Sequence, residues 1–115
     1  KDVIIVVPDG DIDISSITGT FQVLHWANDY WQKMGHRPAI RIRPASVETE
    51  LKLNFGFFSI HPLHIGEIEN ADLLIIPSLS QDYDAVIRKN KELVTWIREQ
   101  YKNGAEIASL CTGTF

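Results

Sequence analysis

The stretch that decides the fold is Val3-Ile-Ile-Val-Val-Pro-Asp-Gly10. A run of β-branched residues that stops at a proline and a glycine is typical of a strand buried on both faces of a parallel sheet. Two later stretches show the same pattern: Leu73-Leu-Ile-Ile76 ends at Pro77, and residues 105–110 end at a Cys-Thr-Gly turn. The sequence therefore predicts three central strands of one mostly parallel sheet.

Helical patterns lie between these strands. In the first, apolar residues recur every 3.6 positions after a capping serine, Ser15 or Ser16, and the pattern stops at Gly35. A second helix is predicted over residues 91–102. Strands that alternate with helices predict an α/β fold with helices on both faces of the sheet. The remaining elements are predicted as less regular strands over residues 40–45 and 51–60, near an edge or in a hairpin, and a short helical turn over 83–88.

The first helix is apolar over too much of its circumference to cover a sheet on one side only. Its apolar residues form two neighbouring stripes. The first stripe holds Ile17, Phe21, Leu24 and Trp31, and the second holds Val23, Ala27, Tyr30 and Met34. We expect part of this helix to meet a second copy of the chain in a homodimer. The alternative is a helix that lies under a neighbouring loop.

Composition and charge narrow the class of protein. The 115 residues include 15 acidic and 11 basic side chains, a net charge of −4 that argues against a nucleic-acid groove in this segment. The hydrophobic fraction of 44% and the charged fraction of 23% match an ordinary globular domain. No apolar run is long enough for a membrane span, so no membrane partner is predicted. A cytoplasmic location is expected.

Cys111 is the residue most suggestive of chemistry. It is the single cysteine, it directly follows a predicted strand, and Thr112 and Gly113 follow it. A tight strand-to-helix turn at this point would hold the sulfur at the edge of the sheet, where a helix N-terminus favours the thiolate. The alternative is a cysteine packed in the core as a small hydrophobic residue.

Nucleophilic catalysis would also need a base near the thiol. Asp11 and Asp13 come from the loop after the first strand, although aspartates beside glycine are also common in solvated turns. His61 and His64 supply only two candidate ligands, whereas a catalytic zinc site normally has three, so no metal site is predicted. No glycine-rich phosphate loop is present, and no cofactor is predicted.

The end of the chain resembles a known family. Ala108-Ser-Leu-Cys-Thr-Gly-Thr-Phe115, preceded by Lys102-Asn-Gly-Ala105, resembles the nucleophile elbow of the ThiJ/PfpI superfamily, which is related to class I glutamine amidotransferases. Within it, Ser16-Ile-Thr-Gly-Thr-Phe-Gln-Val-Leu24 with Ala27-Asn28 is most similar to the N-terminal sensor domains of AraC-type transcriptional regulators. The resemblance implies a flavodoxin-like three-layer sandwich, of which residues 1–115 form the N-terminal part. The rest of that domain and a helix-turn-helix DNA-binding domain are expected beyond Phe115.

The resemblance also implies roles for particular residues. Enzymes of the superfamily pair the elbow cysteine, here Cys111, with a carboxylate on the loop before the first helix, and several use a histidine shortly after the elbow. An ungapped alignment of the first helix places Ser16 where the acid should be, with Asp13 three residues earlier. A serine supplies no carboxyl group for proton transfer. The expected position of the histidine lies past Phe115.

These departures favour a ligand-sensing and dimerisation domain of an AraC-family regulator without catalytic activity. It would bind a small-molecule effector, and DNA only through the C-terminal domain. The alternative is a cysteine-dependent enzyme with amidase-, glyoxalase- or hydratase-like activity, and a third interpretation is a redox sensor. Ligands of such sheets bind at the carboxyl ends of the strands, in loops 10–16, 77–81 and 111–114. The candidate ligand-binding residues are Gly10, Asp13, Ser16, Pro77, Ser78, Cys111, Thr112 and Gly113.

Overall fold

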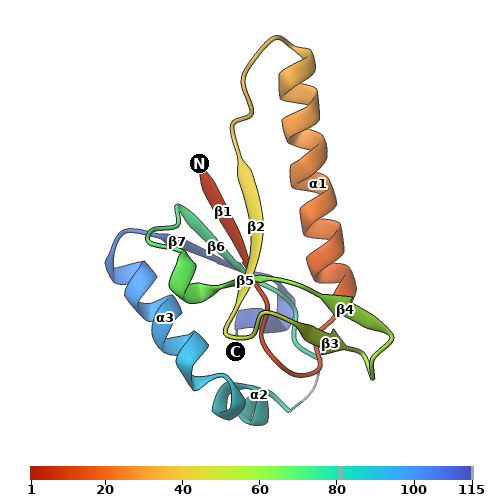
Figure 1. Ribbon diagram of the computed structural model, residues 1–115, viewed down its shortest axis with the longest axis vertical. Coiled ribbons are helices and arrows are strands. Elements are labelled where there is room, and N and C mark those ends of the chain that lie inside the picture. Colours follow the sequence, from red (N-terminus) through yellow and green to blue (C-terminus); the bar gives the residue numbers. More distant parts are fainter. Residues whose placement is uncertain (81, 115) are drawn as a thin grey trace.

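A computed structural model describes residues 1–80 and 82–114 of the chain (Figure 1). Gln81 and Phe115, which belong to the predicted loop 77–81 and the elbow motif, lie outside the described residues. In chain order the elements are β1 (Asp2–Val6), α1 (Ile14–Lys33), β2 (Arg41–Ser46), β3 (Leu51–Leu53), β4 (Phe58–Ile60), β5 (Leu63–His64), η1 (Ile65–Glu67), β6 (Leu73–Ile76), α2 (Tyr83–Lys89), α3 (Lys91–Lys102), β7 (Glu106–Ser109) and η2 (Cys111–Thr114).

Five strands form one parallel sheet in the order β5-β2-β1-β6-β7. The first strand of the chain is therefore central, and Val3 is paired with Ile42 on one side and Leu73 on the other. All three predicted strands are confirmed, and β6 has the predicted bounds. One expectation is wrong: within the described residues β7 is not central, because it pairs with β6 alone and forms an edge.

Alternation along β1 sends side chains to opposite faces of the sheet. Ile4 and Val6 join one buried cluster, which packs under α3, and Ile5 and Val7 join the other. The second cluster is closed by Ile17 of α1 and by residues of the β3–β4 hairpin. The predicted arrangement of helices on both faces is confirmed, and Figure 1 shows α1 and α3 on either side of the sheet.

Helix α1 begins two or three residues earlier than a cap at Ser15 or Ser16 predicts. The carboxylate of Asp13 accepts a hydrogen bond from the backbone N–H of Ser15, 3.2 Å away, so Asp13 is the N-cap. Only Ile17 is buried, and the second half of the helix extends past the sheet (Figure 1). The alternative of a helix under a neighbouring loop is wrong within the described residues, because large apolar side chains are 41% to 68% exposed. They are Phe21, Val23, Trp26, Tyr30, Trp31 and Met34.

The remaining elements largely follow the predictions. Helix α3 has the predicted bounds, and α2 is the short helix expected before it. Strands β3 and β4 form the predicted hairpin, with Leu51 opposite Ile60 and Leu53 opposite Phe58. Strand β2 lies one place inside the sheet edge, which the two-residue strand β5 occupies. Among the described residues no helix is long and apolar enough to cross a membrane.

Candidate functional site

The turn after β7 has the geometry of a nucleophile elbow. Cys111 has a φ angle of +48°, in the left-handed region that residues with a side chain seldom adopt. The backbone N–H of Leu110 donates to Ile76 O (2.9 Å), and that of Gly113 donates to Leu110 O (2.8 Å), which fixes the turn against β6. The Cys111 side chain is exposed, so the alternative of a core cysteine is wrong.

Gly113 and Pro77 shape this turn. A Cβ atom on Gly113 would lie 2.5 Å from Pro77 O and 2.8 Å from Ile76 O, and real Cβ atoms do not approach backbone oxygens so closely. Both Gly113 and Pro77 are buried. These two predicted ligand-binding residues therefore hold the elbow against the end of β6, in a contact that requires glycine.

Three hydroxyl side chains join the loops around the elbow, and we call Ser16, Ser78 and Thr112 the hydroxyl cluster. Ser16 Oγ accepts a hydrogen bond from Ser78 N (3.0 Å). Ser78 Oγ lies 3.0 Å from Thr112 Oγ1. Thr112 Oγ1 also accepts from Leu79 N (2.9 Å) and donates to Leu79 O. The structure thus brings together Ser16 from the first turn of α1, Ser78 from the loop after β6, and Thr112 of η2, next to Cys111.

Neither Ser16 nor Asp13 makes a hydrogen bond to the Cys111 thiol among the described residues. The hydroxyl of Ser16 donates to Asp13 O (2.7 Å), so its proton is engaged by that backbone oxygen. One oxygen of the Asp13 carboxylate accepts from both N (3.2 Å) and Oγ (2.7 Å) of Ser15. Within residues 1–80 and 82–114, the Cys111 sulfur has neither a hydrogen bond nor an ion pair. Among the described residues, therefore, no hydrogen bond or ion pair links the thiol to a group that could act as a general base.

Gly10 lies apart from the hydroxyl cluster. It has a φ angle of +133°, and a Cβ atom there would meet Val86 of α2 at 3.6 Å. The later part of the same loop does join the site: Asp13 N donates to Ser78 O (3.0 Å), and Ile12 forms an antiparallel bridge with Leu79. Of the predicted residues on this loop, Asp13 and Ser16 reach the elbow region, while Gly10 belongs to the contact with α2.

Asn90 is a structural residue that the sequence analysis missed. Its buried side chain accepts a hydrogen bond from Asp9 N (2.8 Å) and donates to Asp9 O and Val86 O (both 2.8 Å). It thereby holds the loop after β1 against the junction of α2 and α3. The only signal in the sequence is an asparagine ahead of a helix, which would equally suit an exposed N-cap.

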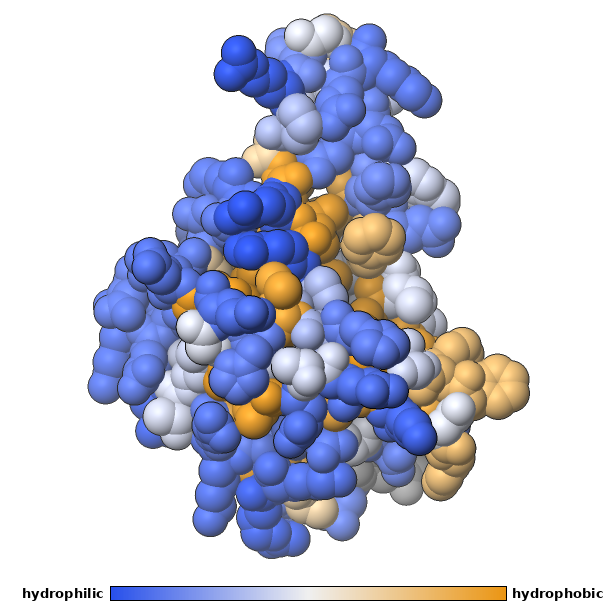
Figure 2. All heavy atoms as spheres, viewed as in Figure 1, coloured by the Kyte–Doolittle hydropathy of each residue, from blue (hydrophilic) through white to orange (hydrophobic). Residues whose placement is uncertain are grey.

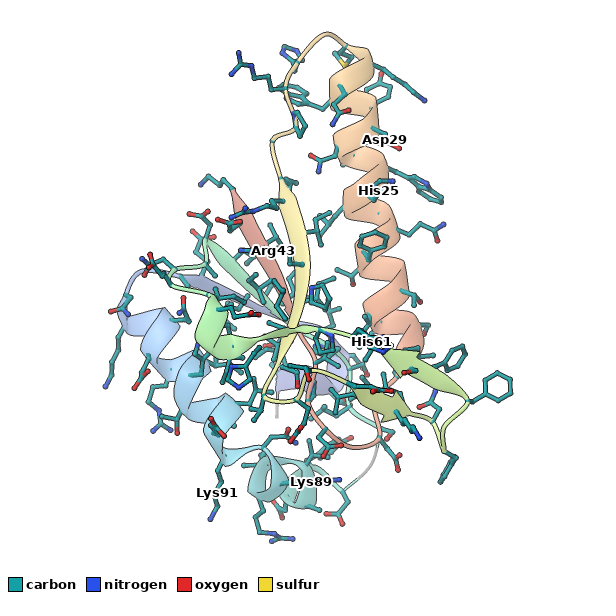
Figure 3. The ribbon with its side chains drawn as sticks, viewed as in Figure 1. His25, Asp29, Arg43, His61, Lys89 and Lys91 are labelled. Atoms are coloured by element: carbon teal, nitrogen blue, oxygen red, sulfur yellow. The ribbon has the colours of Figure 1, made fainter. Side chains whose placement is uncertain are left out.

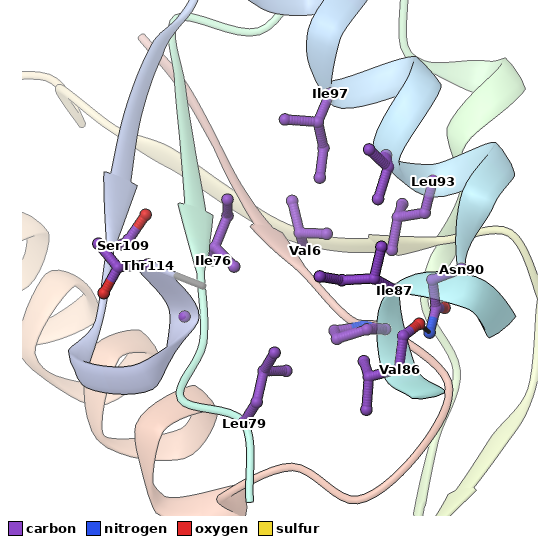
Figure 4. Close-up of a pocket in the computed structure, with 13 residues that line it drawn as sticks. Val6, Ile76, Leu79, Val86, Ile87, Asn90, Leu93, Ile97, Ser109 and Thr114 are labelled. Atoms are coloured by element: carbon purple, nitrogen blue, oxygen red, sulfur yellow. Dashed lines mark hydrogen bonds between the residues drawn. The ribbon is translucent and has the colours of Figure 1, made fainter. Parts of the chain in front are cut away.

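An apolar cavity of about 220 Å³ opens between α2, α3 and the carboxyl ends of β1, β6 and β7 (Figure 4). The elbow residues Gly113 and Thr114 form part of its wall, and Asn90 and Ser109 add polar atoms. Most of the lining is aliphatic, including Val6, Leu79, Val86, Ile87, Leu93 and Ile97. A mostly apolar cavity with a few polar groups suits a small organic molecule.

The histidines do not line this cavity, and among the ion pairs Lys89–Asp9 (3.3 Å) lies next to its lining residues Pro8 and Asn90 (Figure 3). His64 caps η1, because its Nδ1 accepts from Gly66 N (2.9 Å), and His61 lies 3.9 Å from Glu50. Among the described residues no three side chains of metal-ligating type gather. At the amino end of β1, the hydrogen bond from Arg41 Nε to Asp2 (2.6 Å) lowers the pKa of the Asp2 carboxyl.

Fold and elbow together define a class: the chain has the α/β fold of the DJ-1/ThiJ/PfpI proteins. No protein-family model and no curated protein matches the sequence. The likeness is therefore one of three-dimensional structure.

The similar solved structures include transcriptional regulators. A candidate transcriptional regulator from Vibrio parahaemolyticus superposes with a TM-score of 0.77 at 22% identity, over 97% of this chain and 56% of that one. An AraC family transcriptional regulator from Pseudomonas putida gives 0.70 at 16% identity, over 98% and 66%. Toxoplasma gondii DJ-1 gives 0.61 at 17% identity, over 97% and 56%. The chain thus spans between half and two thirds of each of these proteins, and at such identities the likeness shows the fold.

Proposed function

We propose that this chain is the ligand-sensing and dimerisation domain of an AraC-type transcriptional regulator and that it has no catalytic activity. The observation that carries the proposal is the set of hydrogen bonds made by the Ser16 hydroxyl. This residue aligns with the acid of the superfamily enzymes, and its hydroxyl is held between Ser78 N and Asp13 O. Two of the similar solved structures are regulators or candidate regulators, which supports the same assignment.

In this proposal the elbow is kept as a binding surface. The hydroxyl cluster ties the elbow to the loop after β6 and to the start of α1. A small effector bound beside Cys111 and Thr112 would contact all three loops at once. DNA would be bound by a separate C-terminal domain, in keeping with the net charge of −4 on this one.

The first prediction concerns the effector. In a thermal-shift screen of the intact protein against small metabolites, at least one compound is expected to raise the melting temperature. A ligand at 100 times its dissociation constant adds about 2.7 kcal/mol to the stability of the folded state. Cys111→Trp, which adds a large side chain at the elbow, is expected to abolish the shift, while Tyr101→Ser, at an exposed position of α3, keeps it. A shift that survives Cys111→Trp would place the ligand elsewhere, and a silent screen would contradict the sensing role.

The second candidate function is a cysteine-dependent enzyme, which the strained and exposed position of Cys111 favours. We expect no turnover of amides or of α-oxoaldehydes above the rate of the Cys111→Ser variant, because no hydrogen bond among the described residues links the thiol to a base. The measurement is a comparison of initial rates at neutral pH. A rate that falls about 100-fold or more on Cys111→Ser would establish the enzyme and overturn the non-catalytic assignment.

A substitution at Trp31 on α1 tests the proposed dimer. Trp31 is 41% exposed on the part of α1 that extends past the sheet, and we expect it to be buried by a second copy. Trp31→Glu would place a charge in that contact, so it is expected to turn the dimer into a monomer in sedimentation equilibrium. Tyr101→Glu, a similar change on α3, should leave the dimer intact. A wild-type protein that stays monomeric at high concentration would contradict the dimerisation role.

A further inference from the structure

The hydroxyl cluster holds all three of its protons inside the protein. Thr112 Oγ1 bonds to Leu79 O, which can only accept, so Thr112 donates there. Because a hydroxyl has a single proton, Thr112 must accept at its contact with Ser78 Oγ (3.0 Å), and Ser78 is the donor. The proton of Ser16 goes to Asp13 O (2.7 Å). The donor and acceptor roles are therefore fixed, and rotation of any of the three hydroxyls breaks a hydrogen bond.

These hydrogen bonds form a continuous path from the elbow to the start of α1. On the elbow side the path depends on the Thr112 hydroxyl, which bonds to Leu79 N (2.9 Å), Leu79 O and Ser78 Oγ. On the other side Ser16 Oγ accepts from Ser78 N (3.0 Å), and Asp13 N donates to Ser78 O (3.0 Å). Asp13 is the N-cap of α1, and Ser16 lies in its first turn. A displacement of Thr112 is thus transmitted to α1 through the loop after β6.

The elbow is a place where such a displacement can begin. Cys111, directly before Thr112, has a φ angle of +48°, a conformation that costs of the order of 1–3 kcal/mol for a residue with a side chain. The Cys111 side chain is exposed, whereas Gly113, directly after Thr112, is buried against Pro77 O. A ligand at Cys111 therefore contacts the accessible and strained end of the turn, and a change in the Cys111 backbone moves Thr112 directly.

Helix α1 is suited to enlarge a small change at its first turn. Of its twenty residues, all of them described, Ile17 alone is buried, and it lies at the start of the helix. The Asn28 side chain bonds to both N (3.1 Å) and O of Ile40, so the returning chain is fastened to the helix. Figures 1 and 2 show the far end of α1 standing clear of the rest of the molecule. At 1.5 Å per residue the helix is about 30 Å long, so a rotation of about 5° at its start moves the far end by about 2.5 Å.

We propose that the Thr112 hydroxyl couples the elbow to α1: occupation of the site beside Cys111 displaces Thr112, and the bond between Ser78 and Ser16 passes the displacement to the helix. The inference rests on the proposed sensing function and adds how a bound effector changes the helix to which dimerisation is assigned. Thr112 is a positioning residue in this account. The alternative is that the hydroxyl cluster only stabilises the turn, so that the elbow and α1 respond independently.

The test occupies the elbow of the intact protein with N-ethylmaleimide. The Cys111 sulfur adds across the double bond of this reagent, which places a ring at the elbow, and Cys111→Ser treated in the same way gives the baseline. Amide hydrogen exchange before and after modification reports on Leu79, which is bonded to Thr112, and on Ile17 at the start of α1. We expect the exchange rates of both amides to change about 10-fold or more. An unchanged rate at Ile17 would overturn the coupling.

Two variants of Thr112 separate the hydroxyl from the shape of the side chain. Thr112→Ser keeps the hydroxyl, so the response at Ile17 should remain. Thr112→Val keeps the shape but loses every bond of the hydroxyl, so the response at Ile17 should disappear even where mass measurement shows complete modification of Cys111. The melting temperature of each variant establishes that it is folded.

A break farther along the path tests the order of the steps and serves if Thr112→Val does not fold. Ser16→Ala removes the acceptor for Ser78 N, so modification of Cys111 should still change exchange at Leu79 but no longer at Ile17. Ser15→Ala is the matched control, because it removes a hydroxyl from the same turn that bonds only to the Asp13 carboxylate. Both responses should survive it.

The possible results separate this coupling from the sensing function. A response at Ile17 that persists in Thr112→Val or Ser16→Ala would overturn the path through the hydroxyl cluster. A response that Ser15→Ala also abolishes would overturn it too, since the stability of the turn would then explain the effect. In either case the sensing function stands if the thermal-shift screen finds a ligand. A silent screen beside an intact response at Ile17 would remove the sensing function and leave the connection between the elbow and α1.

Discussion

Gly113→Ala is expected to destabilise the protein by about 3 kcal/mol, among the largest effects of any single methyl group added to the described residues. The added carbon would lie 2.5 Å and 2.8 Å from the carbonyl oxygens of Pro77, which is buried, and of Ile76, which is half-buried. Relief requires the elbow to move away from β6, which breaks the bond from Leu110 N to Ile76 O. The measurement is urea-induced unfolding of both proteins, followed by circular dichroism.

A control for this change lies in α1. Gly19 has no atom within 4 Å of an added Cβ, and alanine has the higher helix propensity. Gly19→Ala is therefore expected to raise the free energy of unfolding by about 0.5–1 kcal/mol, opposite in sign to Gly113→Ala. If both variants lie within 0.5 kcal/mol of the wild type, about the error of such a measurement, the close packing of the elbow against β6 is refuted.

Asn90→Ala is expected to cost about 2–3 kcal/mol. It removes the acceptor for Asp9 N and the donor for Asp9 O, two half-buried backbone groups that carry a desolvation penalty without partners, whereas Val86 O keeps its bond from Asn90 N. Local opening of the loop after β1 should follow, so amide hydrogen exchange at Asp9 should accelerate along with the drop in stability.

Asn103→Ala is the matched control for Asn90→Ala. Asn103 also lies at a helix end, as the C-cap of α3, but it is exposed. Its replacement should change the free energy of unfolding by less than about 0.5 kcal/mol. Equal effects of the two substitutions would mean that helix capping, rather than the link to the loop, explains the role of Asn90.

Much of the fold follows from local sequence. The runs at β1 and β6 are apolar on both faces of a strand, and that pattern alone identifies interior strands of a parallel sheet. The bounds of helix α3 were predictable because its strong apolar stripe stops before Gly104, which has a φ angle of +102°. The cap of α1 was less predictable, since Asp13, Ser15 and Ser16 all suit an N-cap and only the chain path selects among them.

The site was predictable only where it depends on neighbouring residues. The elbow at Cys111 follows from a strand that runs into Thr112 and Gly113. The bond between Ser16 and Ser78 joins residues 62 positions apart, so it depends on how two loops meet and leaves no trace in local pattern. Gly10 was grouped with the elbow because it follows a central strand, but its loop first passes α2 and only then turns toward the site.

The central place of β1 sets the order in which the chain can fold during synthesis. Val3 needs Leu73 as a neighbour, seventy residues later, and ribosomes add about 5–20 residues per second. The run Val3-Ile-Ile-Val-Val7 is therefore made early and stays without its second partner strand for roughly 4–14 seconds. During that interval it is an apolar segment with unpaired edges, which chaperones or other nascent chains can bind. When the protein is expressed in a host cell, growth of the host at low temperature with additional chaperone should raise the yield of correctly folded protein. This gain should exceed that from substitutions of surface residues.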